Sequence, residues 1–162
     1  MSIQRHGTTR RYSDSVAHNG TVYLVEAPSN LDADITAQTE NLLASIDALL
    51  ANAGSDKSCL LMVTIYLADM ADYDAMNDVW DHWLPEGCAP TRACVQARLA
   101  NPKFRVEMVV TAANFLIDAE SNLKAALGGM QAASPAAADK PAAVGHRAVG
   151  VLNAVDAAAG SV

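Results

Sequence analysis

Residues 91–113 read TRACVQARLANPKFRVEMVVTAA, and the side chains alternate in character in two parts of this stretch. One set of alternate positions in the first part holds Ala93, Val95, Ala97 and Leu99, and the other holds Arg92, Cys94, Gln96 and Arg98. Arg105–Ala113 alternates in the same way. Alternation with period two is typical of β-strands, and Asn101-Pro102-Lys103 supplies a turn. The stretch therefore predicts two strands, Thr91–Arg98 and Arg105–Ala113.

Three more strands are predicted upstream. Two β-prone runs, Tyr12–Ala17 and Thr21–Glu26, flank His18-Asn19-Gly20. Asn-Gly favours a type I′ hairpin turn, because both central residues of that turn have positive φ. Leu60–Leu67 is a compact apolar run between polar residues, which indicates a buried strand.

Two helices are predicted between these strands. Apolar residues recur at helical spacing in Ile35–Leu50, and Gly54 follows as a C-terminal stop. A second helix begins at Asp72 and ends before Pro85. Its apolar stripe consists of Tyr73, Met76, Asn77, Trp80, Trp83 and Leu84. Asn77 is the amide in that stripe, and a buried amide needs hydrogen-bond partners.

The predicted order is β-β-α-β-α-β-β, an α+β fold with a single mixed sheet. Right-handed crossovers place both helices on one face of the sheet. We expect the other face to carry Arg92, Cys94, Gln96 and Glu107 without cover from its own chain. Because this face is half apolar, we expect it to be buried against another subunit.

Composition restricts the classes of protein to consider. The 162 residues match about one domain, and eleven basic against eighteen acidic residues give a net charge of −7. That charge disfavours binding to nucleic acid and to anionic membranes. The apolar runs are far shorter than the ~20 residues of a membrane helix. Three cysteines without CxxC spacing indicate free thiols, so we expect a soluble cytoplasmic protein.

The chain divides into residues 1–117, an α+β domain, and residues 118–162, an Ala-rich C-terminal tail. Gly-Gly and Pro residues interrupt the tail, although 118–127 has the composition of a short helix. We expect the tail to be flexible or partly helical, with a partner-binding arm as the alternative.

Metal and cofactor chemistry have little support in the sequence. The four histidines, His6, His18, His82 and His146, are scattered without the spacing of metal ligands. Nucleotide-binding and nucleophile-elbow motifs are also missing. The sequence therefore predicts neither a metal nor a cofactor.

Four residues form a candidate site for chemistry on a small molecule. Arg92 offers a planar fork suited to a carboxylate, and Glu107 is able to orient or deprotonate a water. Cys94 and Asn77 complete the group. Spacing alone equally allows structural roles: an Arg92–Glu107 ion pair, a buried thiol and a satisfied amide.

The chain resembles the RidA/YjgF family of small trimeric imine and enamine deaminases, especially its YoaB-like subgroup. The resemblance spans Arg10 to Ala113 and rests on the words LDAD, QT, IDA, GSDKS, AMN-W, VQA, NPK and VE taken together. It implies a chorismate-mutase-like homotrimer with active sites in clefts between subunits. It also implies hydrolysis of reactive 2-imino or 2-enamino acids to 2-keto acids and ammonia, without metal or cofactor.

The resemblance also assigns roles to individual residues. Arg92, in Pro90-Thr91-Arg92, binds the substrate carboxylate, and the backbone carbonyl of Cys94 faces the substrate nitrogen. Glu107 orients the attacking water, and Tyr12 and Asn77 line the pocket. The chain departs from the family where Val25-Glu26 replaces a small polar residue followed by glycine. Glu26 would then weaken carboxylate binding or pair with Arg92 in the empty site.

Three functions follow in order of preference. The first is an imine or enamine deaminase acting on a small imino acid. The second is a non-catalytic trimer that senses a metabolite such as a 2-keto acid. The third is a ribonuclease or translation inhibitor, which the net charge and the missing pair of catalytic histidines disfavour.

Overall fold

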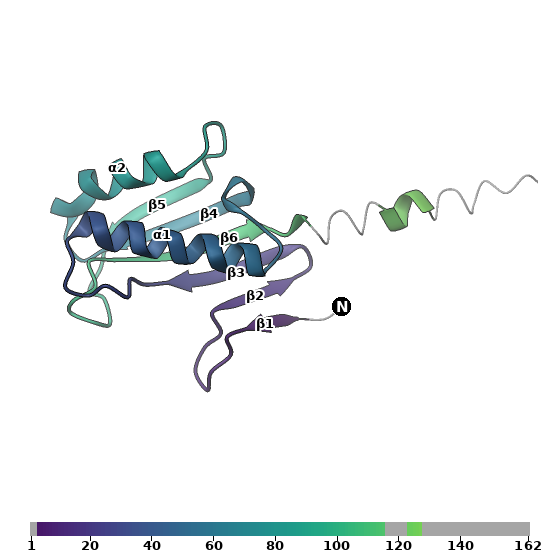
Figure 1. The fold of residues 1–162 in the computed structure, drawn as a ribbon, viewed down its shortest axis with the longest axis horizontal. Coiled ribbons are helices and arrows are strands. Elements are labelled where there is room, and N and C mark those ends of the chain that lie inside the picture. The colour runs from purple at the N-terminus through teal and green to yellow at the C-terminus, as the bar shows by residue number, and fades with distance from the viewer. Residues whose placement is uncertain (1–2, 116–122, 128–162) are drawn as a thin grey trace, which may run out of the picture.

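The computed structural model describes residues 3–115 and 123–127. The helices and strands, in chain order, are β1 (Gln4–His6), β2 (Ser15–His18), β3 (Thr21–Glu26), α1 (Ile35–Asn52), β4 (Leu60–Leu67), α2 (Tyr73–Trp83), β5 (Thr91–Gln96) and β6 (Val106–Ala113). Short 3₁₀ turns at Lys57–Cys59 and Met70–Asp72 precede β4 and α2. Figure 1 shows both helices on one side of the strands.

All six strands form one sheet in the order β1-β2-β3-β6-β4-β5. β4 pairs in parallel with β5, whereas the other neighbouring pairs are antiparallel. The prediction of a single mixed sheet with both helices on one face is therefore confirmed. β1 is an addition that the sequence did not predict, because its three residues, Gln-Arg-His, are all exposed and lack apolar alternation.

The core lies between the helices and the sheet. On α1 the fully buried side chains recur at helical spacing and include Leu42, Ile46 and Leu50. They form one core with alternate residues of three strands, which are Val22 and Leu24 on β3, Val106, Met108, Val110 and Ala112 on β6, and Val63, Ile65 and Leu67 on β4. This alternation fixes which side chains of the central strands face the helices.

Local sequence accounts for the ends of several elements. The Asp34 carboxylate accepts a hydrogen bond from the backbone N–H of Ala37 at 2.9 Å and caps α1. Asn19 and Gly20 have φ of 50° and 74°, as the predicted hairpin turn between β2 and β3 requires. β2 begins at Ser15 rather than at Tyr12. Tyr12 lies in the loop before it, where its carbonyl accepts hydrogen bonds from Thr9.

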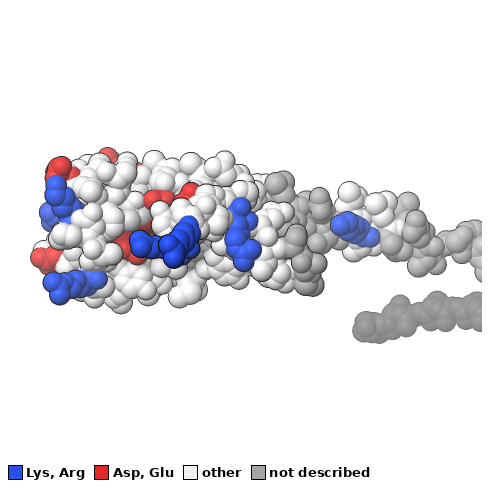
Figure 2. Space-filling view, turned by 90° about the horizontal axis from the view of Figure 1, so that it is seen from below, with Lys and Arg blue, Asp and Glu red and all other residues white. Residues whose placement is uncertain are grey.

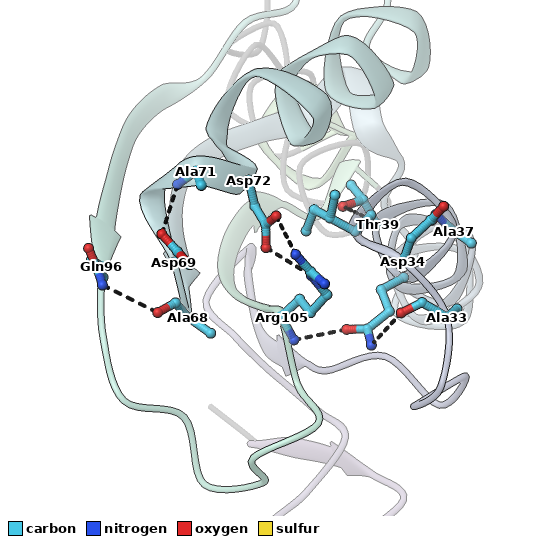
Figure 3. Close-up of polar contacts among 12 residues, drawn as sticks. Ala33, Asp34, Ala37, Thr39, Ala68, Asp69, Ala71, Asp72, Gln96 and Arg105 are labelled. Carbon is cyan, nitrogen blue, oxygen red and sulfur yellow. Dashed lines mark hydrogen bonds and ion pairs between the residues drawn. The ribbon is translucent and has the colours of Figure 1, made fainter.

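Partly buried polar contacts fasten the loop before β6 to the helical layer (Figure 3). The Gln38 amide nitrogen donates to the carbonyl of Lys103 at 2.9 Å, and its oxygen accepts from the backbone N–H of Arg105 at 2.9 Å. The Arg105 guanidinium forms two hydrogen bonds, of 2.9 and 2.6 Å, with the Asp72 carboxylate. These contacts hold the β5–β6 connection against the beginnings of both helices.

The predicted tail lies mostly outside the described residues. Residues 123–127 are helical and exposed. The remainder of the tail is outside the described part of the chain, so its flexibility stays a prediction. Of the helices that the structure describes, none has the length and apolar character to cross a bilayer.

Candidate functional site

Arg92 lies on the edge strand β5 and is held by two side chains of α2. Its Nη1 donates a hydrogen bond to Oδ1 of Asn77 at 2.8 Å. The carbon at the centre of the guanidinium lies 5.4 Å from the centre of the Trp80 ring, within the range of a cation–π contact. Asn77 therefore has the partner that its place in the apolar stripe required. Sequence reasoning assigned Trp80 to the core and missed its contact with Arg92.

Cys94 shares this side of the sheet. It pairs with Ile65 of β4 and packs against the buried core. Burial raises the pKa of its thiol, and the nearby charge of Arg92 only partly offsets this effect. A thiol with a raised pKa stays protonated at neutral pH and is a poor nucleophile. The side chain of Cys94 is therefore a packing group, and a role for its backbone carbonyl stays a prediction.

Glu107 lies on the opposite face of the sheet. Its neighbours Val106 and Met108 are fully buried beneath the helices, so the side chain of Glu107 points the other way. It is half-buried and opposite Tyr66 of β4. The sheet itself separates Glu107 from Arg92. The structural alternative, an Arg92–Glu107 ion pair within one chain, is therefore wrong.

The predicted contents of the two sheet faces need correction. Arg92, Cys94 and Gln96 do share a face, but it is the face that the helices cover and not the open one. Glu107 is correctly assigned to the open face. The prediction was wrong because alternation separates the side chains of a strand into two sets without showing which set faces the helices. On β5 the polar set lies on the helix side, where α2 supplies partners for Arg92, although Arg92 and Gln96 remain exposed.

The remaining predicted site residues are spread over other parts of the fold. Tyr12 is 65% exposed in its loop, and Val25 is 53% exposed on the open face. Glu26 ends β3 and points toward α1. Two strands, β6 and β4, separate β3 from β5, which is about 14 Å at the usual strand spacing. Glu26 and Arg92 of one chain are therefore too far apart to pair, and an ion pair between them across a subunit cleft stays a prediction.

Glu26 has an environment of its own. Its Oε1 accepts a hydrogen bond from the backbone N–H of Ala27 at 3.2 Å. Burial raises the pKa of this carboxyl, and the nearby charge of Asp14 adds to the rise, whereas hydrogen bonds from Ser45 and Ala27 oppose it. The folded protein therefore favours the protonated form of Glu26 more than the unfolded chain does.

This raised pKa predicts a dependence of stability on pH. Between the ordinary pKa of 4.5 and the higher value in the folded state, the folded protein binds more protons than the unfolded chain. The free energy of unfolding should therefore fall as the pH rises through this window. We expect Glu26→Gln to lose less stability than the wild type between pH 4 and pH 7. Urea unfolding across that range measures the difference.

Glu40→Gln, which replaces an exposed glutamate of α1, is the matched control for this comparison. It should follow the wild-type pH dependence. If the free energy of unfolding changed with pH equally in the wild type and in Glu26→Gln, the folded protein would not favour protonated Glu26, and this prediction would be wrong.

The open face of the sheet is rich in exposed apolar side chains. Tyr23, Val25, Met62 and Val95 are each 44–53% exposed on β3, β4 and β5. A patch of this kind on a sheet face is typical of a surface that another subunit covers. A hollow of about 530 Å³ lies elsewhere, between α1 and α2, and its lining includes neither Arg92 nor Glu107.

Metal binding has no geometric support in the described segments. Within residues 3–115 and 123–127, no three His, Cys, Asp or Glu side chains are grouped so that they could hold a metal ion. His82 bonds through Nδ1 to the backbone carbonyl of Asp78 at 2.6 Å, one turn earlier on α2.

Comparison with known proteins agrees with this architecture. Residues 2–114 match the family described as Endoribonuclease L-PSP. The chain therefore belongs to this family, which includes the RutC and YjgF proteins, and the predicted resemblance is confirmed.

About 70% of this chain aligns with nearly the full length of two relatives. The RutC family protein YoaB of Escherichia coli is 51% identical over 113 residues, which are 70% of this chain and 99% of YoaB. The crystal structure of NMB1025 from Neisseria meningitidis, a member of the YjgF family, superposes with a TM-score of 0.69 at 49% identity and covers 70% of this chain and 96% of its own. More distantly, the 3-aminoacrylate deaminase RutC of Acinetobacter baylyi is 38% identical over 79 residues, 49% of this chain and 62% of RutC.

Proposed function

We propose that this protein hydrolyses small 2-imino and 2-enamino acids to 2-keto acids and ammonia. The observation that carries the proposal is the Arg92 guanidinium, positioned by Asn77 and Trp80 with its remaining donors directed to no other side chain of the described residues. A planar cationic fork of this kind matches the carboxylate of a small acid. A relative named 3-aminoacrylate deaminase supports deamination of a small enamino acid, although that substrate carries its nitrogen on carbon 3 rather than carbon 2.

The proposed site requires two subunits. Arg92 and Glu107 lie on opposite faces of one sheet, so a single chain cannot bring both to one small substrate. We therefore propose a homotrimer, typical of the family, in which the apolar open face is covered by a neighbouring subunit. Each cleft then combines Arg92 of one subunit with Glu107 of the next.

The reaction needs positioning more than strong catalysis, because an imine is already electrophilic. Arg92 would hold the carboxylate, and the backbone carbonyl of Cys94 would accept a hydrogen bond from the substrate N–H. Glu107 would orient a water and accept its proton as the oxygen attacks the carbon of the protonated imine, whose nitrogen takes up the C=N electron pair. The resulting carbinolamine loses ammonia when the C–N bond breaks and the C=O bond forms, with the proton returned to the leaving nitrogen. An enamino acid first takes a proton at carbon to become this protonated imine.

A coupled assay tests this proposal. An amino-acid oxidase or a threonine dehydratase generates the imine, and semicarbazide traps whatever is not hydrolysed. We propose that the full chain suppresses semicarbazone formation for at least one small imino acid. If it does not, while calorimetry shows saturable binding of 2-oxobutanoate, the protein is a non-catalytic metabolite sensor.

The description of the family also raises ribonuclease activity, which the charge of this chain disfavours. The net charge of −7 opposes binding to a phosphate backbone. On the face drawn in Figure 2, the blue basic side chains stand singly or in small groups, several of them beside red acidic ones. Incubation of the purified protein with RNA under the assay conditions tests this alternative directly.

A further inference from the structure

The contacts between α2 and Arg92 have a regular spacing. Asn77 and Trp80 are three residues apart, so both project from the same face of the helix. The Asn77 amide holds one end of the guanidinium through Nη1, and the Trp80 ring lies against its centre. Trp80 itself is only 4% exposed and is therefore fixed by the core.

This arrangement leaves one edge of the guanidinium available. Arginine has five N–H donors, and in the described residues the side chain of Arg92 donates one hydrogen bond, from Nη1 to Asn77. The Nε and Nη2 donors lie along the edge that binds carboxylates with two parallel hydrogen bonds. An arginine side chain free to rotate would lose conformational entropy on binding, whereas a fixed one has already lost it.

We propose that Trp80 is a positioning residue that holds the guanidinium of Arg92 by a cation–π contact, so that its Nε–Nη2 edge faces the carboxylate of the ligand. The identity of this ligand as an imino or keto acid rests on the proposed function, but the restraint on Arg92 does not. Asn77 determines the direction of the guanidinium through a hydrogen bond, and Trp80 supplies an aromatic surface that a purely structural core residue would not need.

Substitutions at Trp80 distinguish a role in positioning Arg92 from a purely structural role in the core. We expect Trp80→Leu to weaken 2-oxobutanoate binding about three- to fivefold in calorimetry, the scale of a cation–π contact to an exposed arginine. Trp80→Phe should retain most of the affinity because it keeps an aromatic face. For imine hydrolysis, the loss should be mainly in KM. Trp83→Leu is the matched control, because it removes a ring that packs against Trp80, with ring centroids 5.4 Å apart, but whose own cation–π contact is with Lys57 and whose N–H donates to Asp47. It should change binding less than twofold.

An isosteric test avoids any effect on folding. The chain has two tryptophans, so in a Trp83→Phe background fluorinated tryptophan replaces Trp80 alone. Fluorine withdraws electron density from the ring face while nearly preserving its shape, so affinity should fall as more fluorine is introduced. Unchanged affinity across the series, or equal losses for Trp80→Leu and Trp83→Leu, would overturn the proposal.

A measurement on Arg92 itself distinguishes this proposal from the proposed function. The Nε–H group of Arg92 should give an NMR signal of restricted motion in the wild type, and Trp80→Leu should make it mobile. This result would support the positioning role even if the wild type neither hydrolysed imines nor bound keto acids. Equal mobility in the wild type and in Trp80→Leu would refute the positioning role even if the deaminase activity were present.

Discussion

Mixed trimers of Arg92→Ala and Glu107→Gln chains are expected to recover imine hydrolysis that each variant lacks alone. Either substitution should reduce kcat/KM by about a hundredfold or more. Arg92→Ala removes the group that donates hydrogen bonds to the substrate carboxylate, and Glu107→Gln removes the group that accepts the proton of the attacking water. Arg92 and Glu107 lie on opposite faces of the sheet, so each proposed cleft takes one of them from each of two subunits. A mixed trimer then contains an interface where both residues are intact.

The fraction of activity that is recovered tests whether each cleft combines Arg92 of one subunit with Glu107 of the next. In a cyclic trimer with two chains of one kind and one of the other, one interface in three joins an intact Arg92 to an intact Glu107, so activity should return to about a third of the wild-type value. Two different affinity tags on co-expressed chains isolate the mixed trimers. Arg98→Ala mixed with wild type is the control and should remain fully active. Mixed trimers as inactive as their parents would place both residues in a site made by one chain.

Much of the fold was predictable because most elements have a strong local signal. The apolar run Leu60–Leu67 became β4 with the same limits, and Asn19-Gly20 formed the expected hairpin turn. β1 was missed because its pairing with β2, rather than any pattern of its own, makes it a strand. Tyr12 was placed in a strand because β-propensity does not show where pairing begins.

The site was predictable in its residues but not in its arrangement. The resemblance supplied Arg92, Glu107 and Asn77 as candidates, and alternation correctly grouped Arg92 with Cys94. Sequence could not show that α2 contacts Arg92, since this depends on how far the helix extends over the edge strand. The i, i+3 spacing of Asn77 and Trp80 was visible, but only the structure identifies their common partner.

Gln38→Leu is expected to destabilise the protein by ~3–5 kcal/mol, although leucine fits the volume of the buried site. Gln38 is fully buried, and its amide nitrogen lies within 3.3 Å of the carbonyls of Leu31, Ala33 and Lys103, while its oxygen accepts from the Arg105 N–H. Leucine would leave these backbone groups without their partner, and each buried polar group so affected costs ~1–3 kcal/mol.

Gln96→Leu is the control, because it makes the same substitution at an exposed position. Gln96 is exposed and makes one long hydrogen bond, 3.4 Å, to the carbonyl of Ala68. It should change the free energy of unfolding by less than ~0.5 kcal/mol. Urea unfolding at a fixed chain concentration compares the variants, because assembly contributes to stability. Equal, small changes for both would mean that water replaces the Gln38 amide, and that the β5–β6 connection between Arg92 and Glu107 does not depend on it.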